Sequence, residues 1–127
     1  MVCLDTDILI GLLRNDTKTI EKIAQFTKEE KIHTTAINIF ELWRGVYKKK
    51  SAQGKVAVES LLEDLECLDL DKDAASIAAQ IYEQLASRGK MSDFLDVLIA
   101  AIAVQNNDTL MTGNRKHFDQ IQELTLV

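Results

Sequence analysis

The sequence contains no proline, which suits a chain built mostly of helices joined by short turns. It has only two cysteines, Cys3 and Cys67, and two histidines, with no Cys-x-x-Cys pair and no cluster of histidine with cysteine. This pattern argues against a structural zinc site, and it favours buried free thiols over a disulfide. We assign no role to His33 or His117, which are isolated from each other along the chain.

Long apolar runs are also missing from the sequence. The longest, Val97 to Val104, is far shorter than the roughly 20 residues that a membrane-spanning helix needs. The N-terminus carries Asp5 and Asp7 and no basic stretch, so it does not resemble a signal peptide. We therefore expect a cytoplasmic protein without a membrane anchor. A chain of 127 residues, 46% of them hydrophobic, is expected to form one domain over residues 1–127.

The charge is acidic overall but unevenly distributed. The net charge is −5; residues 1–58 carry ten Lys and Arg against seven Asp and Glu, and residues 59–127 carry five against 13. A basic segment in the first half holds Arg44, Lys48, Lys49, Lys50 and Lys55. Cations are also favourable near the C-terminus of a helix, so a solvated helix end remains an alternative to a phosphate-binding segment.

Short β-prone segments alternate with helical patterns along the chain. This alternation predicts an α/β fold with a mostly parallel sheet of four or five strands and helices on both faces. The predicted strands are 2–4, 32–35, 67–70, 109–112 and a final edge strand at 124–127. The predicted helices are 8–13, 16–28, 36–49, 56–66, 71–87 and a central one within 92–106, with a loop or helical turn at 113–118.

Four polar side chains are expected at one edge of this sheet, where ligands gather beyond the carboxyl ends of parallel strands. Asp5 follows the first strand, Glu41 lies in the helix after the second, Asp96 opens the central helix, and Asn114 follows strand 109–112. Clustered carboxylates repel one another, so such a cluster is costly without a cation. Oxygen ligands without histidine or cysteine suit Mg²⁺ or Mn²⁺, which can stabilise charge on a reacting phosphate.

Most of these residues also have a simpler interpretation. Asp5 is a natural N-cap for the first helix. Asp93 as N-cap and Asp96 at the third helical position would form an aspartate version of the capping box. Asn114 follows a glycine, where asparagine is most often a turn residue.

Glu41 has the strongest structural alternative. It could lie on a solvent face shared with Asn38 and Lys48 and pair with Arg44, three residues later. Aromatic residues make up only 6% of the chain, and three of them, Phe40, Trp43 and Tyr47, follow a helical spacing in the same segment. For these three we favour packing in the core over a platform on which bases stack.

The motifs around the four polar residues resemble the PIN domain family, and within it the VapC-type ribonuclease toxins. Leu4–Ile10 (LDTDILI) resembles the family's N-terminal segment, and Thr34–Val46 resembles the segment in which a strand leads to a helix with Glu and Gly. Asp96–Ala101 matches the signature Asp-x-x-Ile-Ala-Ala. Thr112–Phe118 resembles the last segment, with Asn114 where some members have Asp. The resemblance covers nearly the whole chain.

The resemblance implies a PIN-like three-layer α/β/α fold with an acidic metal pocket. It implies cleavage of RNA by hydrolysis, with Mg²⁺ or Mn²⁺ held by three catalytic residues, Asp5, Glu41 and Asp96. We expect Asp93 and Asn114 to complete the metal's ligands directly or through water. Asn114 leaves the binding of a second ion open.

Further residues are assigned supporting roles in this mechanism. We expect Thr6 and Thr112 to orient the ligands, and Arg44, Lys48, Lys49 and Lys50 to contact phosphates. The resemblance also implies RNA as substrate, a VapB-type antitoxin as partner and a homodimer. Two alternatives remain: a PIN-like protein that binds RNA or a partner without cleaving, and a haloacid dehalogenase-like phosphatase with Asp5 as nucleophile.

Overall fold

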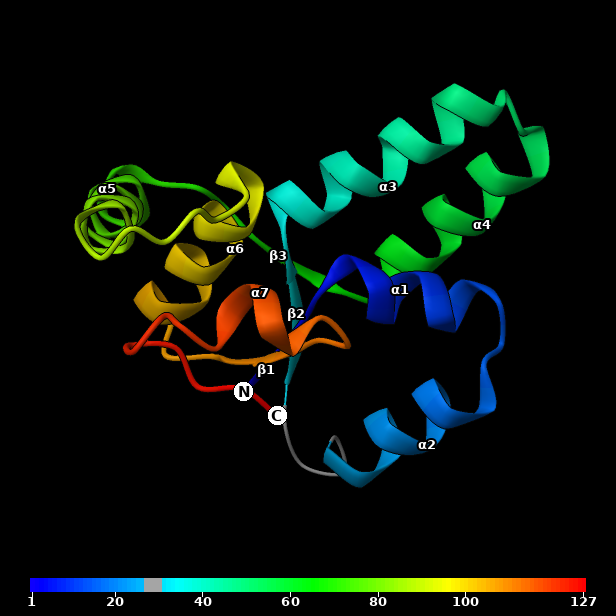
Figure 1. The fold of residues 1–127 in the computed structure, drawn as a ribbon. Coiled ribbons are helices and arrows are strands. Elements are labelled where there is room, and N and C mark those ends of the chain that lie inside the picture. Colours follow the sequence, from blue (N-terminus) through cyan, green and yellow to red (C-terminus); the bar gives the residue numbers. More distant parts are fainter. Residues whose placement is uncertain (27–30) are drawn as a thin grey trace.

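The computed structural model describes residues 1–26 and 31–127 and contains one four-stranded sheet (Figure 1). All strand pairs are parallel, and the strand order is β3-β2-β1-β4. The strands are short: β1 is Val2–Leu4, β2 is Ile32–Thr35, β3 is Glu66–Leu68 and β4 is Thr109–Met111. The prediction of a parallel α/β fold is therefore confirmed.

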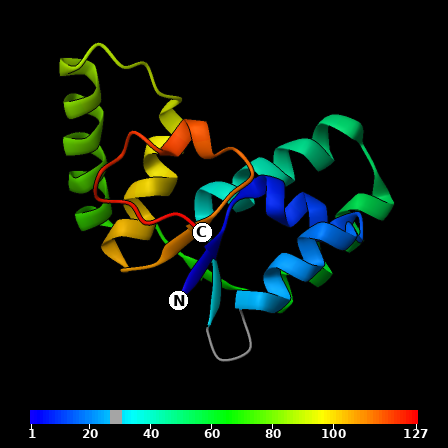
Figure 2. The same ribbon diagram turned by 60° about the horizontal axis from the view of Figure 1, so that its bottom comes forward.

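Helices cover both faces of this sheet, as Figures 1 and 2 show. One side carries α5 and α6, and the other carries α1 to α4. A short α7 follows β4. The bounds of the helices are α1 Thr6–Leu13, α2 Thr17–Phe26, α3 Ala36–Lys49, α4 Ala52–Glu63, α5 Lys72–Ser87, α6 Phe94–Gln105 and α7 Arg115–Phe118.

The sheet divides the hydrophobic core into two main clusters. Because successive side chains of a strand point to opposite faces, Cys3 packs with α5 and α6, while Val2 and Leu4 pack with the helices of the other side. Helix α6 is buried through Ile99, Ala100, Ala101, Ile102 and Ala103. The small alanine side chains let α6 lie close to its neighbours, and this fixes the position of its N-terminal turn at the sheet edge.

The bounds of α4 and β3 differ from the prediction. Helix α4 begins at Ala52 rather than 56, because the Ser51 side chain accepts a hydrogen bond from Gly54 N (2.9 Å) and caps an earlier turn. It ends at Glu63, and Glu66 already pairs with His33 in the sheet, so β3 is Glu66–Leu68 and not 67–70.

The structure also differs from the prediction at the C-terminal segment and at the first helix. The predicted edge strand 124–127 is wrong, since this segment joins the sheet only through a single bridge between Leu110 and Leu126. The first helix begins at Thr6, two residues earlier than predicted. The predicted end of the second helix at Lys28 lies outside the described residues.

Cys67 and His33 are placed differently from what the sequence suggests. Both cysteines are free, as expected, but only Cys3 is buried and Cys67 is exposed. His33 is not isolated in the fold: it is buried, with its Nδ1 2.6 Å from Asp108 Oδ2 and its Nε2 3.2 Å from Glu66 Oε2. Over residues 1–26 and 31–127, no helix combines the length and the apolar character needed to cross a membrane.

Candidate active site

Asp5 lies at the carboxyl end of β1 and is only 5% exposed. Its Oδ1 accepts hydrogen bonds from Thr6 N (2.8 Å) and Asn38 Nδ2 (3.0 Å), and its Oδ2 accepts one from Thr112 Oγ1 (2.7 Å). Burial raises the pKa of this carboxyl, and the three donors oppose that rise. Asp5 is thus both the N-cap of α1, as its simpler interpretation held, and the centre of a polar network.

Asn38 is fully buried beneath Asp5 and not on a solvent face, so that part of the alternative for Glu41 is wrong. Its Nδ2 donates to Asp5 Oδ1 and to Thr6 Oγ1 (2.8 Å), and its Oδ1 accepts from Thr35 Oγ1 (2.6 Å). Thr35 and Asn38 together form the capping box of α3. Sequence reasoning missed Asn38, although the spacing Thr35-x-x-Asn38 at a strand–helix junction was a usable signal.

Glu41 lies one turn further along α3 and is half-buried beside Asp5. Its Oε1 accepts a hydrogen bond from Thr6 Oγ1 (2.7 Å). Burial is the main cause that raises its pKa, and the charges of Asp5 and Asp93 add to the rise, while the Thr6 hydrogen bond and Arg44 lower it. Glu41 therefore faces the other acids and is not a purely solvent-exposed side chain.

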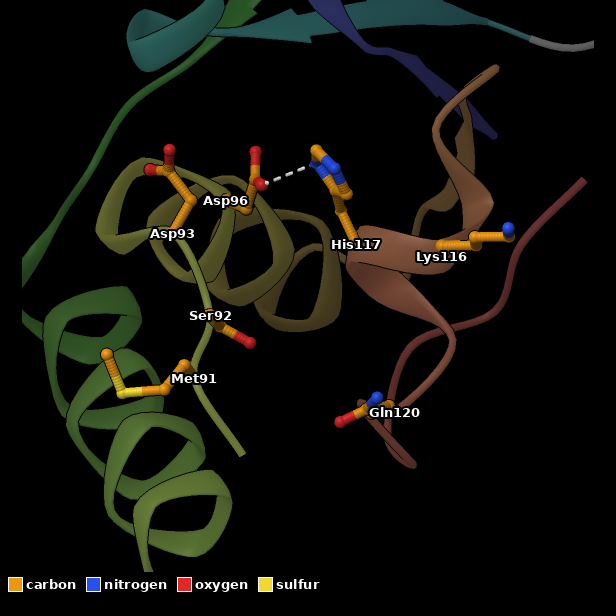
Figure 3. A pocket seen from close by; sticks show the side chains of 7 residues that line it. All are labelled: Met91, Ser92, Asp93, Asp96, Lys116, His117 and Gln120. Atoms are coloured by element: carbon orange, nitrogen blue, oxygen red, sulfur yellow. Dashed lines mark hydrogen bonds and ion pairs between the residues drawn. The ribbon is translucent and has the colours of Figure 1, made fainter. Parts of the chain in front are cut away.

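Asp93 and Asp96 bring a third element to the site, the N-terminal end of α6 (Figure 3). Asp93 caps α6 by accepting from Leu95 N (2.8 Å), as expected of an N-cap. Asp96 has a largely buried side chain, and its pKa is raised to about 6 by burial and then by the charges of Asp93, Asp5 and Glu41. The acids of β1, α3 and α6 are thus close enough to interact.

His117 was given no role from the sequence, yet the fold brings it to Asp96. Its Nδ1 lies 3.1 Å from Asp96 Oδ2, and Figure 3 shows the two side chains turned toward each other from α7 and α6. The positive form of the imidazole lowers the pKa of Asp96. A pocket beside this pair is lined by Met91, Ser92, Asp93, Asp96, Lys116, His117 and Gln120. No sequence signal pointed to this contact, because His117 belongs to no strand end or helix cap that would place it beside Asp96.

The loop after β4 closes the site. Thr112 is buried, and its Oγ1 donates to Asp5 and accepts from Asn114 N (3.0 Å). Asn114 is exposed and makes no side-chain capping bond to α7. Gly113 N donates to Asp7 Oδ2 (2.7 Å), so Asp7 ties the first turn of α1 to this loop. The other oxygen of Asp7 is buried and has no hydrogen-bond partner among the described residues.

The chemistry of these side chains fits a hard divalent cation. Within the part of the chain that the structure describes, no three His, Cys, Asp or Glu side chains stand close enough to enclose a metal ion as they are placed. However, Asp5, Glu41 and Asp96 have raised pKa values, partly because neighbouring carboxylates repel them, and a cation would relieve that repulsion. All the donors are oxygens, which suits Mg²⁺ or Mn²⁺.

The basic residues lie at the far end of α3. Arg44, Lys48, Lys49 and Lys50 are all exposed, and Lys48 and Lys49 belong to the last turn of α3, where cations are also favourable. Two aromatic residues of the same helix, Phe40 and Tyr47, were predicted to pack in the core. That prediction is wrong, since Phe40 is 51% and Tyr47 66% exposed. Trp43, between them, packs partly against the core.

Comparisons with known proteins agree with this fold. The profile of the PIN domain family matches residues 2–124. Among curated proteins, "Ribonuclease VapC2" from Rickettsia felis is 29% identical over 125 residues, covering 97% of this chain and 93% of that protein. The "tRNA(fMet)-specific endonuclease VapC" from Shigella flexneri is 26% identical over 119 residues, covering 93% of this chain and 89% of that protein.

Solved structures give the same result. The structure of VapBC2 from Rickettsia felis bound to a DNA fragment from their promoter matches with a TM-score of 0.92 and 28% identity, covering 100% of this chain and 98% of that chain. FitAcB from Neisseria gonorrhoeae matches with a TM-score of 0.86 and 25% identity, covering 100% and 97%. The chain therefore belongs to the PIN domain family and, within it, to the VapC ribonuclease toxins.

Proposed function

We propose that this protein is a metal-dependent endoribonuclease that hydrolyses RNA phosphodiester bonds as the toxin of a type II toxin–antitoxin pair. The observation that carries the proposal is the convergence of Asp5, Glu41 and Asp96 from the end of β1, α3 and α6, where burial, and next the charges of neighbouring carboxylates, raise their pKa values. Burying three acids together is costly, so we infer that a cation offsets their charge during function.

Asp5, Glu41 and Asp96 would hold Mg²⁺ or Mn²⁺, with Asp93 and Asn114 contacting it directly or through water. When bound, such an ion lowers the pKa of a water molecule and offsets negative charge on the phosphate. Asp5 suits this role through its Oδ2 atom. This oxygen accepts one hydrogen bond, from Thr112 Oγ1, and therefore retains a lone pair for a metal ion.

The surrounding residues orient these ligands through a directed set of hydrogen bonds. Asn38 donates to Thr6 Oγ1, so the Thr6 hydroxyl is free to donate its own hydrogen to Glu41 Oε1. Thr112 likewise accepts from Asn114 N and donates to Asp5 Oδ2. Both hydroxyls thus stabilise the ionised form of an acid that burial would protonate.

Relatives support the biological context of the proposal. The matched solved structures include VapBC2 and a toxin–antitoxin complex from Klebsiella pneumoniae, so we propose that a VapB-type antitoxin binds this chain. A homodimer and a cytoplasmic location, where cellular RNA is found, belong to the same proposal. The phosphatase alternative loses its basis, since the chain belongs to the PIN domain family.

One observation favours a second candidate, a PIN-like protein that binds RNA or a partner without cleaving. Asn114 occupies a motif position at which some members of the family have Asp. In addition, the acids among the described residues do not enclose a metal ion as they are placed. This alternative predicts tight RNA binding with no turnover under any divalent metal.

The test is cleavage of labelled total RNA by antitoxin-free protein in Mg²⁺, Mn²⁺ or EDTA. We expect discrete fragments that require metal and disappear with Asp96→Asn. A matched control is Asp73→Asn, which removes an exposed acid from the first turn of α5 and should leave cleavage unchanged. Equal cleavage by Asp96→Asn would indicate a contaminating nuclease, and no cleavage by protein that still binds RNA would support the second candidate.

A further inference from the structure

One face of α3 carries two exposed aromatic rings, Phe40 and Tyr47, and the partly buried Trp43, alternating with cations. Phe40, Trp43, Arg44, Tyr47 and Lys48 line a shallow, open depression on this helix. They occupy the first, fourth, fifth, eighth and ninth positions of one stretch, which places them on a single helical face. In Figure 1, α1 and α4 lie along one side of α3, and the opposite side is directed away from the sheet.

The rings and cations on this face are already ordered against each other. The rings of Trp43 and Tyr47 stack with centroids 5.7 Å apart and an interplanar angle of 19°. The Arg44 guanidinium lies 5.5 Å from the centre of the Phe40 ring. Rings held in place lose little conformational entropy when a ligand binds, so this arrangement is prepared for stacking.

We propose that this face of α3 is a platform on which bases of single-stranded RNA stack, and that it leads the strand toward the carboxylates. The inference rests on the proposed function and deepens it, because it names the surface of the chain on which the RNA lies. Flat exposed rings interleaved with Arg44 and Lys48 provide what a single strand needs: surfaces for its bases and positive charge for its phosphates.

The platform is continuous with the acidic site. Glu41 belongs to the site, and Arg44 of the platform lies three residues after it on α3, where two side chains of a helix are neighbours on its surface. From Phe40 to Tyr47 the helix rises by roughly 10 Å, about the length of three stacked nucleotides. A strand lying along this face would therefore bring an adjacent phosphate to the carboxylates.

Charge favours RNA over a second copy of this chain as the occupant of the face. A symmetric contact between two copies through this face would bring the cations of one copy, Arg44 and Lys48, toward those of the other, where like charges repel. Residues 59–127 repel RNA, since they carry 13 Asp and Glu against five Lys and Arg. The basic segment of α3 is thus the part of the surface that attracts a polyanion.

The same geometry selects single strands over duplexes. In an RNA duplex the bases are stacked on each other, and their faces are not available to protein rings. We expect a 12-nucleotide oligouridine to bind at least about 10-fold more tightly than a 12-base-pair RNA duplex at equal salt. Equal affinity for both would overturn the proposal.

Trp43 makes the proposal directly observable, because it is the single tryptophan of the chain. Adding oligouridine to the Asp96→Asn variant, which should not cleave it, is expected to quench tryptophan fluorescence to saturation. Tyr47→Ala should raise the Kd about 10-fold, the cost expected for losing one stacking ring, whereas Tyr47→Phe should retain the affinity. Tyr82→Ala, which removes an exposed tyrosine from α5, is the matched control and should leave the Kd unchanged.

Three further results would overturn the proposal: absence of quenching, an unchanged Kd for Tyr47→Ala, or loss of a dimer by Tyr47→Ala with no loss of RNA affinity. The last would show that the face joins two copies. Cleavage by the wild type is scored separately. Cleavage without quenching would support the proposed nuclease activity and refute the stacking platform. Quenching without cleavage would support the platform and refute the nuclease activity.

Discussion

Asn38 shows how one buried amide organises the acidic site. Its amide group is directed by Thr35, which donates to Oδ1, so that Nδ2 points to Asp5 and Thr6. A buried carboxylate without such donors would take up a proton and lose its use as a ligand. Asn38 is therefore a positioning residue that acts through Asp5 and Thr6.

Asn38→Ala is predicted to lower both stability and activity. The change removes the shared donor of Asp5 and Thr6 from a fully buried position, which should cost about 1–3 kcal/mol in the free energy of unfolding. Urea denaturation measures this cost, and RNA cleavage should fall with it. Asn114→Ala is the contrasting variant: Asn114 is exposed and has no side-chain capping bond, so we expect lower cleavage without lower stability. Equal stability of the two variants would contradict the role of Asn38.

Asp96 should make the stability of the metal-free protein depend on pH. Its pKa is about 6 in the folded chain against an ordinary 3.8, so the folded state binds this proton more tightly. The resulting stabilisation is complete below about pH 4 and is lost as the pH rises through 6. In EDTA, the Tm of the wild type should therefore fall relative to that of Asp96→Asn between pH 4 and pH 7. Parallel Tm curves for the two proteins would count against the raised pKa.

At this scale the sequence predicted residue types better than contacts. Asp5, Glu41 and Asp96 could be named because motif spacing and strand ends mark them. Asn38 and His117 could not, because their importance comes from hydrogen bonds between separate elements, to Asp5 and to Asp96. Phe40 and Tyr47 were misplaced for the opposite reason: a helical spacing of rings does not state whether that helix face is covered.

The elements place the site through their ends. Asp5 caps α1 directly after β1, Thr35 caps α3 directly after β2, and Asp93 caps α6. Each capping side chain accepts a hydrogen bond from one free N–H group of a first helical turn, and each helix carries an acid of the site or begins next to one. The capping interpretations and the functional ones are therefore compatible for these residues.

Thr35→Ala is predicted to damage cleavage more than its effect on stability would suggest. Losing this cap should cost about 1 kcal/mol, as for other helix N-caps. It also removes the hydroxyl that orients Asn38, and with it the donor to Asp5. Ser51→Ala is the matched control, because it removes the cap of α4 at similar cost. Thermal unfolding and cleavage, measured on both variants, should show similar stabilities but a larger loss of activity for Thr35→Ala; equal activities would contradict this.

Element types were predictable because hydrophobic periodicity fixes them, whereas several ends were not. Helix α4 starts early because Ser51 caps a turn of Ala52, Gln53 and Gly54, which lack a clear apolar pattern. The segment 124–127 has the alternation of a strand, yet it forms only one bridge to β4. The early start of α4 arises from a local hydrogen bond that periodicity does not record.

The molecule as a whole has an acidic character with one basic element. Three of its cations, Lys48, Lys49 and Lys50, lie at the C-terminal end of α3, while the second half of the chain is strongly acidic. This separation of charge should orient an approaching RNA before any specific contact forms.

Removing the charges of Lys48, Lys49 and Lys50 by substitution with glutamine is predicted to weaken RNA binding and its salt dependence. Three lost phosphate contacts should reduce the slope of log Kd against log salt by about 2 for a single strand. Fluorescence anisotropy at several salt concentrations measures this slope. The double change Lys72→Gln with Lys90→Gln, in the acidic half, should leave it unaltered. An unchanged slope for the triple variant would remove these lysines from the RNA-binding surface.

The alternation of strands and helices made the parallel sheet with helices on both faces predictable. The strand order β3-β2-β1-β4 was not, because it depends on which helices pack together across each face. The proposed antitoxin and homodimer add further contacts that a single chain does not display.

The most direct test of the account is Mn²⁺ binding measured by isothermal titration calorimetry, together with RNA cleavage at the same Mn²⁺ concentrations. We predict that the wild type binds Mn²⁺ with a Kd equal to the concentration that gives half-maximal cleavage, and that Asp5→Asn, Glu41→Gln and Asp96→Asn lose both. Cleavage by the wild type without bound metal, or Mn²⁺ binding unaffected by all three changes, would contradict the central claim that these carboxylates hold the catalytic ion.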